Sequence, residues 1–119
     1  MTNTLNTPIE AIERDFPLRV VRYELARGTG GAGAHRGGDG LIRAIAVRDG
    51  PAHVSLLADR HTLAPPGARG GEPGACGEHL IERAGRTVRV AAKTSIALEP
   101  GDTVIVKTPG GGGYGGRAP

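Results

Sequence analysis

The sequence predicts an all-β fold, namely a small Gly/Pro-rich sandwich or partial barrel of about six short strands with long loops. Short segments of alternating apolar and polar residues recur along the chain, and this two-residue period is typical of half-buried strands. Turn-forming Gly, Pro and Asp residues separate the segments. The chain has 21 Gly and 9 Pro in 119 residues, which leaves few stretches where a long helix is favourable.

Residues 1–17 are predicted to form an N-terminal arm with one short helical turn. Thr7 is placed as the N-cap, Pro8 at the first helical position and Glu10 at the third, a pattern that begins many helices. Pro17 ends the turn, since proline has no backbone N–H for a helix to use.

A β domain is predicted over residues 18–108. Within it, Val21, Tyr23 and Leu25 alternate with charged residues and should share the buried face of the first strand. Strands are expected at residues 18–25, 41–48, 53–59, 80–83, 87–91 and 103–107, with a short apolar run at residues 96–98.

Three short segments are predicted to be turns. Asp49-Gly50-Pro51 is a hairpin-type turn between the second and third strands, and Ala84-Gly85 joins the fourth and fifth as a hairpin. Glu99-Pro100-Gly101-Asp102 precedes the last strand. Pro at its second and Gly at its third position favour a type II turn, in which Gly101 takes a positive φ.

Two glycine runs dominate the loops, one from Gly28 to Gly40 and one from Gly110 to Gly116 in the predicted C-terminal tail, residues 109–119. Neither carries a Walker Gly-Lys-Ser/Thr sequence or a dinucleotide-binding spacing followed by a helix. We therefore interpret both as turned segments that allow close backbone contact with a partner or substrate. The residues expected to face that partner or substrate are His35, Arg36, Gly37, Gly38, Asp39, Gly110, Gly111, Gly112 and Gly113.

The long loop from Arg60 to Gly77 ends near a possible pair of metal ligands. Cys76 and His79 are three residues apart, a spacing that could supply two ligands to zinc. The other two ligands would have to come from a partner chain or from His35, His53 or His61. The alternative is a solvent-facing thiol beside an incidental histidine.

Asp59, Arg60 and Lys93 are weak candidates for catalytic residues. Asp59 and Arg60 follow the third predicted strand, and a carboxylate and a guanidinium there could position an anionic group. The alternatives are a surface ion pair of little energetic value and an ordinary surface lysine. No Ser-His-Asp or Cys-His pattern argues for nucleophilic catalysis.

Composition narrows the function classes. The net charge of +3 comes from scattered residues, without the basic run or the aromatic residues expected of a nucleic-acid-binding surface. No apolar run is long enough to span a membrane and no secretory signal is present, so a cytoplasmic location is expected. With few aromatic residues and a single cysteine, the core should be thin and should need a partner surface.

Several motifs together resemble the C-terminal portion of the hydantoinase B/oxoprolinase family. They occur in the family's order over nearly the whole chain: residues 1–10, 17–20, 30–40, 56–60, 70–74, 93–94, 98–102 and 108–115. Cys76 departs from the pattern, because the family loop resembles Gly-Ala-Pro-Gly there. Family members are several times longer, so the resemblance leaves open a natural small subunit or a piece of a longer polypeptide.

The resemblance implies a small subunit of a multi-subunit ATP-dependent carboxylase of the acetophenone or acetone type, which joins a ketone and bicarbonate. The partners implied are larger hydantoinase A-like and hydantoinase B-like subunits, with ATP and Mg²⁺ bound by the former. One alternative is the C-terminal module of an ATP-dependent N-methylhydantoinase or 5-oxoprolinase. A second alternative is a structural module that braces larger subunits.

Overall fold

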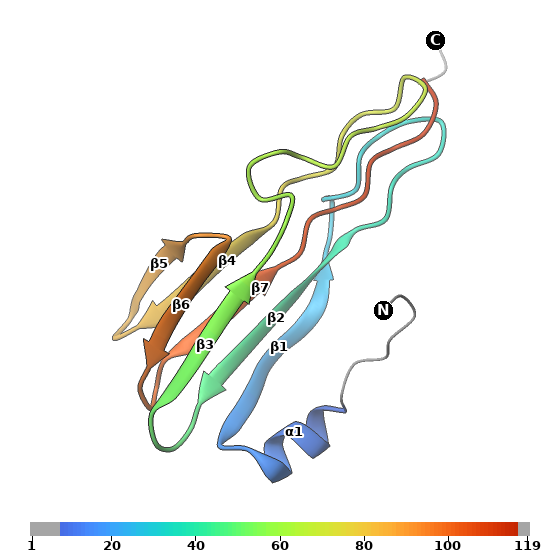
Figure 1. The fold of residues 1–119 in the computed structure, drawn as a ribbon. Coiled ribbons are helices and arrows are strands. Elements are labelled where there is room, and N and C mark those ends of the chain that lie inside the picture. Colours follow the sequence, from blue (N-terminus) through green and yellow to red (C-terminus); the bar gives the residue numbers. More distant parts are fainter. Residues whose placement is uncertain (1–7, 117–119) are drawn as a thin grey trace.

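The computed structural model describes residues 8–116, which form one short helix and seven strands. A five-stranded antiparallel sheet has the strand order β1-β2-β7-β4-β5, and a second sheet pairs β3 with β6 (Figure 1). The all-β prediction is confirmed, with seven strands in place of about six, and neither sheet closes into a barrel. The elements are α1 (Ile9–Asp15), β1 (Leu18–Ala26), β2 (Gly40–Val47), β3 (Ala52–Leu57), β4 (Glu78–Arg83), β5 (Arg86–Val90), β6 (Lys93–Leu98) and β7 (Thr103–Lys107).

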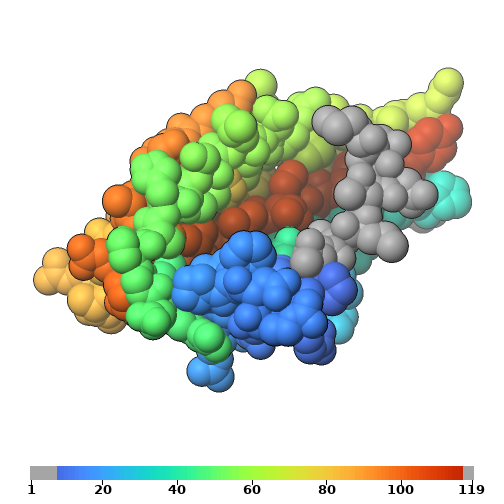
Figure 2. Space-filling model, turned by 60° about the horizontal axis from the view of Figure 1, so that its bottom comes forward, coloured from blue at the N-terminus to red at the C-terminus, as the bar shows by residue number. Residues whose placement is uncertain are grey.

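The molecule is elongated, with principal extents of 56 × 27 × 25 Å. The two sheets occupy one end, and the long connections run side by side away from them (Figure 1). Figure 2 views the sheet end and shows β3 standing apart from the blue N-terminal elements, with the red segment that contains β7 visible between them. The sandwich is therefore open along one side.

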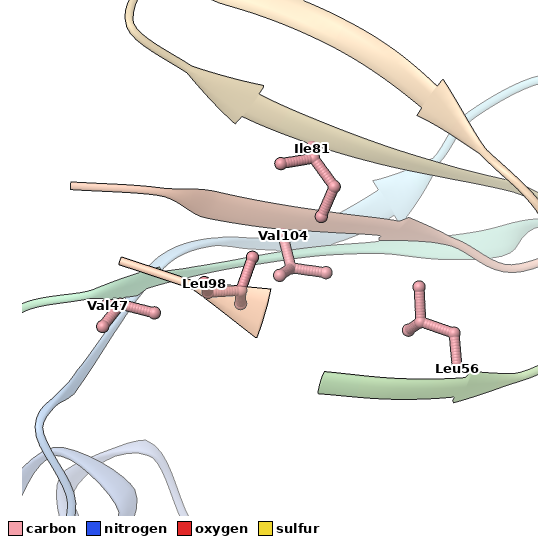
Figure 3. Close-up of a cluster of buried hydrophobic side chains, with 5 residues drawn as sticks. All are labelled: Val47, Leu56, Ile81, Leu98 and Val104. Carbon is pink, nitrogen blue, oxygen red and sulfur yellow. The ribbon is translucent and has the colours of Figure 1, made fainter. Parts of the chain in front are cut away.

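The hydrophobic core lies between the two sheets (Figure 3). Its buried side chains come one from each of five strands: Val47, Leu56, Ile81, Leu98 and Val104. Because successive side chains of a strand point to opposite faces, one face of each strand is directed towards the other sheet. No aromatic side chain belongs to this cluster, which agrees with the thin core expected from composition.

Two predicted turns are confirmed by their backbone angles. Ala84 and Gly85 have φ of 51° and 77°, and positive φ at both central residues is what a type I′ hairpin requires. Gly101 has φ of 94°, and the Asp102 amide donates to the Glu99 carbonyl at 3.0 Å, as in a type II turn.

The prediction of a hairpin at Asp49-Gly50-Pro51 is wrong. Gly50 does take a turn conformation with φ of 68°, but the strands on either side belong to different sheets. β2 pairs with β1 and β7, whereas β3 pairs with β6. The turn is thus a corner that carries the chain from one sheet to the other, which periodicity within each strand could not show.

The N-terminal region differs from the prediction in detail. The helix α1 has seven residues, about two turns, and Pro8 lies at the N-cap position and not at the first helical position. Thr7, the expected cap, lies outside the described residues. None of the α1 residues is buried, and the Glu13 carboxylate accepts a hydrogen bond from the Val20 amide at 2.9 Å, which ties the helix to β1.

The apolar face of β1 is less buried than expected. A bulge between Val20 and Arg22 interrupts its pairing with β2, and Val21, Tyr23 and Leu25 remain 53%, 39% and 50% exposed. The reason is that the β3–β6 sheet does not extend over β1 (Figure 1). Within residues 8–116, no helix combines the length and the apolar character that a membrane span requires.

Candidate functional site

Residues 29–38, 65–75 and 110–115 form a compact bundle, here called the glycine bundle. Residues 110–115 lie in the middle, and the other two stretches surround them as bent loops (Figure 1). Contacts with the central segment repeat every third residue. The amides of Gly110 and Gly113 donate to the carbonyls of Ala75 and Glu72 in the second loop. The amides of Gly111 and Tyr114 donate to the carbonyls of Gly38 and His35 in the first loop, and the Gly115 amide donates to the Ala68 carbonyl. All five distances are 2.8–3.1 Å.

A repeat of three residues is the period of a polyproline II helix. In such a helix each neighbouring segment meets every third residue, so several segments can bond to one central segment. The two glycine runs, which the sequence presented as separate loops, are therefore parts of one element together with the long loop between β3 and β4. The stretch expected to be a tail supplies its centre.

Glycine is required in the bundle because the segments touch backbone to backbone. A Cβ atom on Gly31, Gly37 or Gly113 would overlap a carbonyl oxygen of a neighbouring segment. The same holds for Gly110, where the overlap would be with Thr29, and for Gly112, where it would be with Pro66. Gly38 is an exception, since a Cβ there would meet open space.

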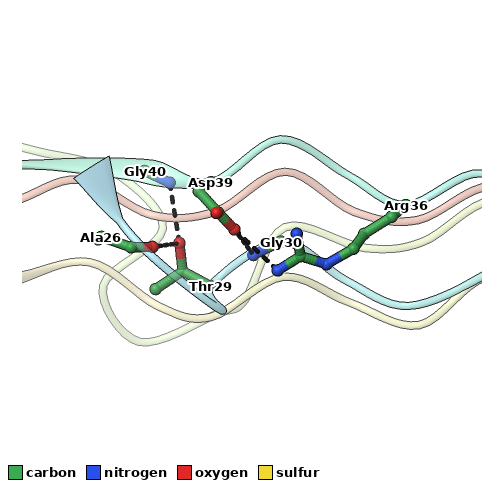
Figure 4. Close-up of polar contacts among 6 residues, drawn as sticks. All are labelled: Ala26, Thr29, Gly30, Arg36, Asp39 and Gly40. Atoms are coloured by element: carbon green, nitrogen blue, oxygen red, sulfur yellow. Dashed lines mark hydrogen bonds and ion pairs between the residues drawn. The ribbon is translucent and has the colours of Figure 1, made fainter.

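The polar residues of the first loop are divided between the inside and the outside of the bundle (Figure 4). The Asp39 carboxylate accepts from the Gly30 amide at 3.0 Å and from the Arg36 guanidinium at 2.9 Å. Its side chain is only 16% exposed. The Gly30 hydrogen bond and, less strongly, the Arg36 charge lower the pKa of Asp39 from its usual 3.8, while desolvation acts in the opposite direction. Asp39 therefore holds the loop, whereas His35 and Arg36 are exposed.

Thr29 fixes the base of the same loop (Figure 4). Its hydroxyl donates to the Ala26 carbonyl at 2.6 Å and accepts from the Gly40 amide at 2.8 Å. These bonds link the end of β1 to the start of β2. The loop consequently leaves the five-stranded sheet in a fixed direction.

A polar cleft of about 780 Å³ lies where β3 and β6 meet the glycine bundle, lined by residues 58–63 and 91–93. Two of the three predicted catalytic candidates meet here, because Asp59 Oδ1 and Lys93 Nζ lie 3.6 Å apart. Arg60 also lines the cleft and has a φ of 63°, which is unusual for a residue other than glycine. Its carbonyl accepts from the Gly77 amide at 3.0 Å, which ties the cleft to the chain just before β4.

His61 and His79 pack together beside the polar cleft; both were considered as possible zinc ligands from the sequence, which did not predict that their rings are in contact. Their ring centroids are 4.4 Å apart with an interplanar angle of 64°. His79 is 3% exposed, and its Nδ1 lies 3.5 Å from the Ala91 carbonyl. Burial lowers the pKa of His61, and the neighbouring His79 and Arg89 lower it further, against a smaller opposing effect of Glu78. The residue in the sequence that reflects this packing is Gly77, because a Cβ atom at that position would lie 2.6 Å from Nε2 of His61.

The structure gives no support to the zinc hypothesis. Cys76 is exposed while His79 is buried. Over residues 8–116 there is no group of three or more His, Cys, Asp or Glu side chains that could hold a metal ion. Of the further ligands considered, only His61 has its ring against His79.

The glycine bundle does not fit a nucleotide phosphate either. A phosphate loop needs backbone amides that point at the ligand. In the bundle the amides of Gly31, Gly74, Gly110, Gly111 and Gly113 all donate to carbonyls of the same chain. The polar cleft has a different chemistry, because Arg60 and Lys93 could orient an anionic group there.

Known proteins resemble this chain over most of its length. The sequence model of the hydantoinase B/oxoprolinase family matches residues 1–117. A Methanocaldococcus jannaschii protein described as uncharacterized is 45% identical over 93% of this chain, and 5-oxoprolinase 1 of Arabidopsis thaliana is 40% identical over 97%. The chain spans 20% and 9% of the lengths of these two relatives.

Two solved structures share the fold. The ATP-dependent caprolactamase of Pseudomonas jessenii superposes with a TM-score of 0.78 at 26% identity, over 94% of this chain and 20% of that one. A nucleotide-free acetone carboxylase superposes with a TM-score of 0.74 at 18% identity, over 92% of this chain and 19% of that one. The second likeness shows the fold alone.

Proposed function

Because the chain belongs to the hydantoinase B/oxoprolinase family, we propose that it acts as one module of a larger ATP-dependent enzyme that opens a cyclic amide. The observation that carries this proposal is the glycine bundle. Its amides are used internally, so the module would not hold the nucleotide, and ATP with Mg²⁺ would bind to a hydantoinase A-like part of the assembly. The module would instead contribute a rigid wall and the polar cleft.

The relatives favour a lactam as the substrate class. The Arabidopsis relative is named a 5-oxoprolinase, and the Pseudomonas jessenii enzyme is named a caprolactamase. Both names refer to enzymes whose named substrates are cyclic amides. ATP-dependent opening produces a carboxylate, and the Arg60 and Lys93 cations of the polar cleft are suited to orient such an anionic group.

A carboxylase of the acetone or acetophenone type, which acts on a ketone and bicarbonate, is the second candidate. An acetone carboxylase chain has the same fold, so the fold is compatible with either reaction. In that assembly the chain would be the small subunit beside larger hydantoinase A-like and B-like subunits. A purely structural module that braces those subunits is the third possibility, and it predicts no effect of the polar cleft on turnover.

Purification of the tagged chain with its associated polypeptides would separate these functions. We expect ATP-dependent turnover of 5-oxoproline or a hydantoin, and no bicarbonate-dependent consumption of acetone or acetophenone. Turnover of the ketones alone would replace the hydrolase proposal with the carboxylase. Purification of the tagged chain from its native host without any associated polypeptide would contradict all three.

Variants of the polar cleft test whether the module takes part in the reaction. Loss of a charge-assisted hydrogen bond to an anionic substrate should raise KM about tenfold to hundredfold in Lys93→Gln, with assembly unchanged. Asp59→Asn removes the carboxylate 3.6 Å from Lys93 Nζ and should have a smaller effect than Lys93→Gln, because both side chains of this ion pair are exposed. Arg86→Gln, at the exposed first position of β5, is the control. If Lys93→Gln turns over like this control, the module only braces its partners.

A further inference from the structure

A second, apolar cleft lies on the open side of the sandwich, between β3 and the five-stranded sheet. Its volume is about 330 Å³, and it is lined mainly by aliphatic residues of β1, β2, β3 and β7. Representative lining residues are Leu18, Ile45, Val54 and Val106. Figure 2 shows this side of the molecule, where β3 and the N-terminal elements stand apart.

Arg43 places a positive charge in the wall of the apolar cleft. It is the only Arg, Lys, Asp or Glu among the lining residues. Its guanidinium carbon lies 5.1 Å from the centroid of the Tyr23 ring, a cation–π contact. Its Nε atom is buried and has no hydrogen-bond partner in the structure. A buried N–H without an acceptor is unfavourable, so this position selects for an occupant that brings one.

The apolar surface continues beyond the cleft along β1. Tyr23 pairs with Arg43 and Leu25 pairs with Leu41, so Tyr23 and Leu25 point to the same face of the sheet as Arg43. They are 39% and 50% exposed because β3 and β6 do not cover β1. The cleft itself is small, about 330 Å³, but the apolar surface continues to Tyr23 and Leu25, so a segment of polypeptide could cover both parts.

We propose that the apolar cleft receives a segment of a neighbouring polypeptide that presents an apolar side chain beside a carboxylate, and that Arg43 binds the carboxylate. Guanidinium and carboxylate groups match in charge and in planar geometry. The presence of such a neighbour rests on the proposed function, in which the chain works within a larger assembly. The relatives leave room for it, because this chain spans 20% or less of their lengths.

Octanoate, an apolar chain that ends in a carboxylate, is the probe for the chemistry of the cleft in the isolated 119-residue chain. In an NMR titration we expect it to shift the Arg43 Nε–Hε signal and the methyl groups of Val54 and Val106. 1-Octanol, which lacks the charge, should bind at least fivefold more weakly. Equal binding of the two compounds, or no shift with either, would overturn the proposal.

Variants show whether Arg43 is responsible. Arg43→Met replaces the guanidinium with an unbranched apolar side chain and should abolish the preference for octanoate over octanol. Arg43→Lys retains a positive charge and should keep part of the preference. Arg19→Met removes an exposed arginine of β1 that does not line the cleft, and should leave the preference unchanged. Retention of the full preference in Arg43→Met would contradict the assignment, provided that the variant keeps the dispersed spectrum of a folded protein.

The purified assembly separates a docked segment from a free acid. If a neighbouring segment occupies the cleft, octanoate should no longer bind there, and phenylglyoxal should no longer modify Arg43. Continued binding and continued modification in the assembly would mean that the occupant is a free aliphatic acid, and would overturn the docking proposal. If no assembly is recovered, the proposed function fails, while the titration of the isolated chain still decides the chemistry of the cleft.

Discussion

His61 shows how a single neighbouring glycine can set the environment of a functional side chain. Gly77 leaves room for the imidazole, which then packs against buried His79 at a ring distance of 4.4 Å. Burial and nearby positive charge disfavour the protonated ring, so the pKa of His61 is lower in the folded protein than its usual 6.5. His61 therefore favours the neutral form at the wall of the polar cleft.

This shift makes stability depend on pH in a defined direction. Because the unfolded chain binds the proton more readily than the folded chain, stability should be full above pH 6.5 and should fall as the pH drops through that value towards the lowered pKa. His61→Gln should weaken this dependence, measured as the change in urea midpoint between pH 7.5 and 5.5. His53→Gln, at an exposed position, is the control and should behave like the parent protein. Equal acid sensitivity of the parent and His61→Gln would refute the assignment.

At the residue scale, the sequence indicated which side chains could matter but not which would meet. Asp59 and Lys93 were separate candidates, and only the pairing of β3 with β6, in which Leu57 lies opposite Lys93, brings them together. Cys76 and His79 are close in sequence, yet one is exposed and the other buried. Contacts between distant segments depend on strand pairing, which local residue patterns do not specify.

At the element scale, strand positions and turn types were predictable because they depend on local chemistry. The type II turn at Gly101 follows from the conformational freedom of glycine, whereas at Ala84-Gly85 only a hairpin was predicted, and its type I′ turn also places Ala84 at a φ of 51°. Which strands pair with one another was harder to predict, as the corner at Gly50 shows. The glycine bundle was not predicted as an element, since its hydrogen bonds join three segments that are far apart in the sequence.

The glycine bundle should tolerate alanine only where the added Cβ atom would meet no neighbouring backbone. Gly110→Ala would place a methyl group against the Thr29 carbonyl, and since backbone cannot move aside easily, the free energy of unfolding should fall by about 3 kcal/mol. Gly38→Ala meets open space and should change it by less than about 1 kcal/mol. Urea unfolding of both variants would measure the difference. Similar losses in the two would contradict the packing described for the bundle.

At the scale of the whole molecule, two parts are held together by different forces. The sandwich has an apolar core of five buried side chains, whereas the glycine bundle depends on backbone hydrogen bonds and close packing of glycines. Both parts meet at the ends of β1, β2, β4 and β7 (Figure 1). Opening of the bundle would expose little apolar surface, so it should cost less free energy than opening of the sandwich.

Hydrogen exchange of the native protein should therefore divide into two groups. Amides of the bundle, such as those of Gly31, Glu72 and Gly113, should exchange together and faster than amides of the central strand β7. Because Gly110→Ala destabilises the closed bundle relative to both the locally opened and the unfolded state, it should accelerate both groups and leave the first group the faster. Exchange of both groups at one common rate would show that the chain opens as a single cooperative unit.

The three-residue repeat of the central segment also limits how chain length can vary in evolution. The amides of residues 110 and 113 both donate to residues 72–75, and those of residues 111 and 114 both donate to residues 35–38. Insertion or deletion of one residue would rotate every later glycine towards the wrong neighbour, whereas a change of three residues would restore the phase. Gaps in these loops among family members should accordingly come in multiples of three, much as gaps in a coding sequence preserve its reading frame.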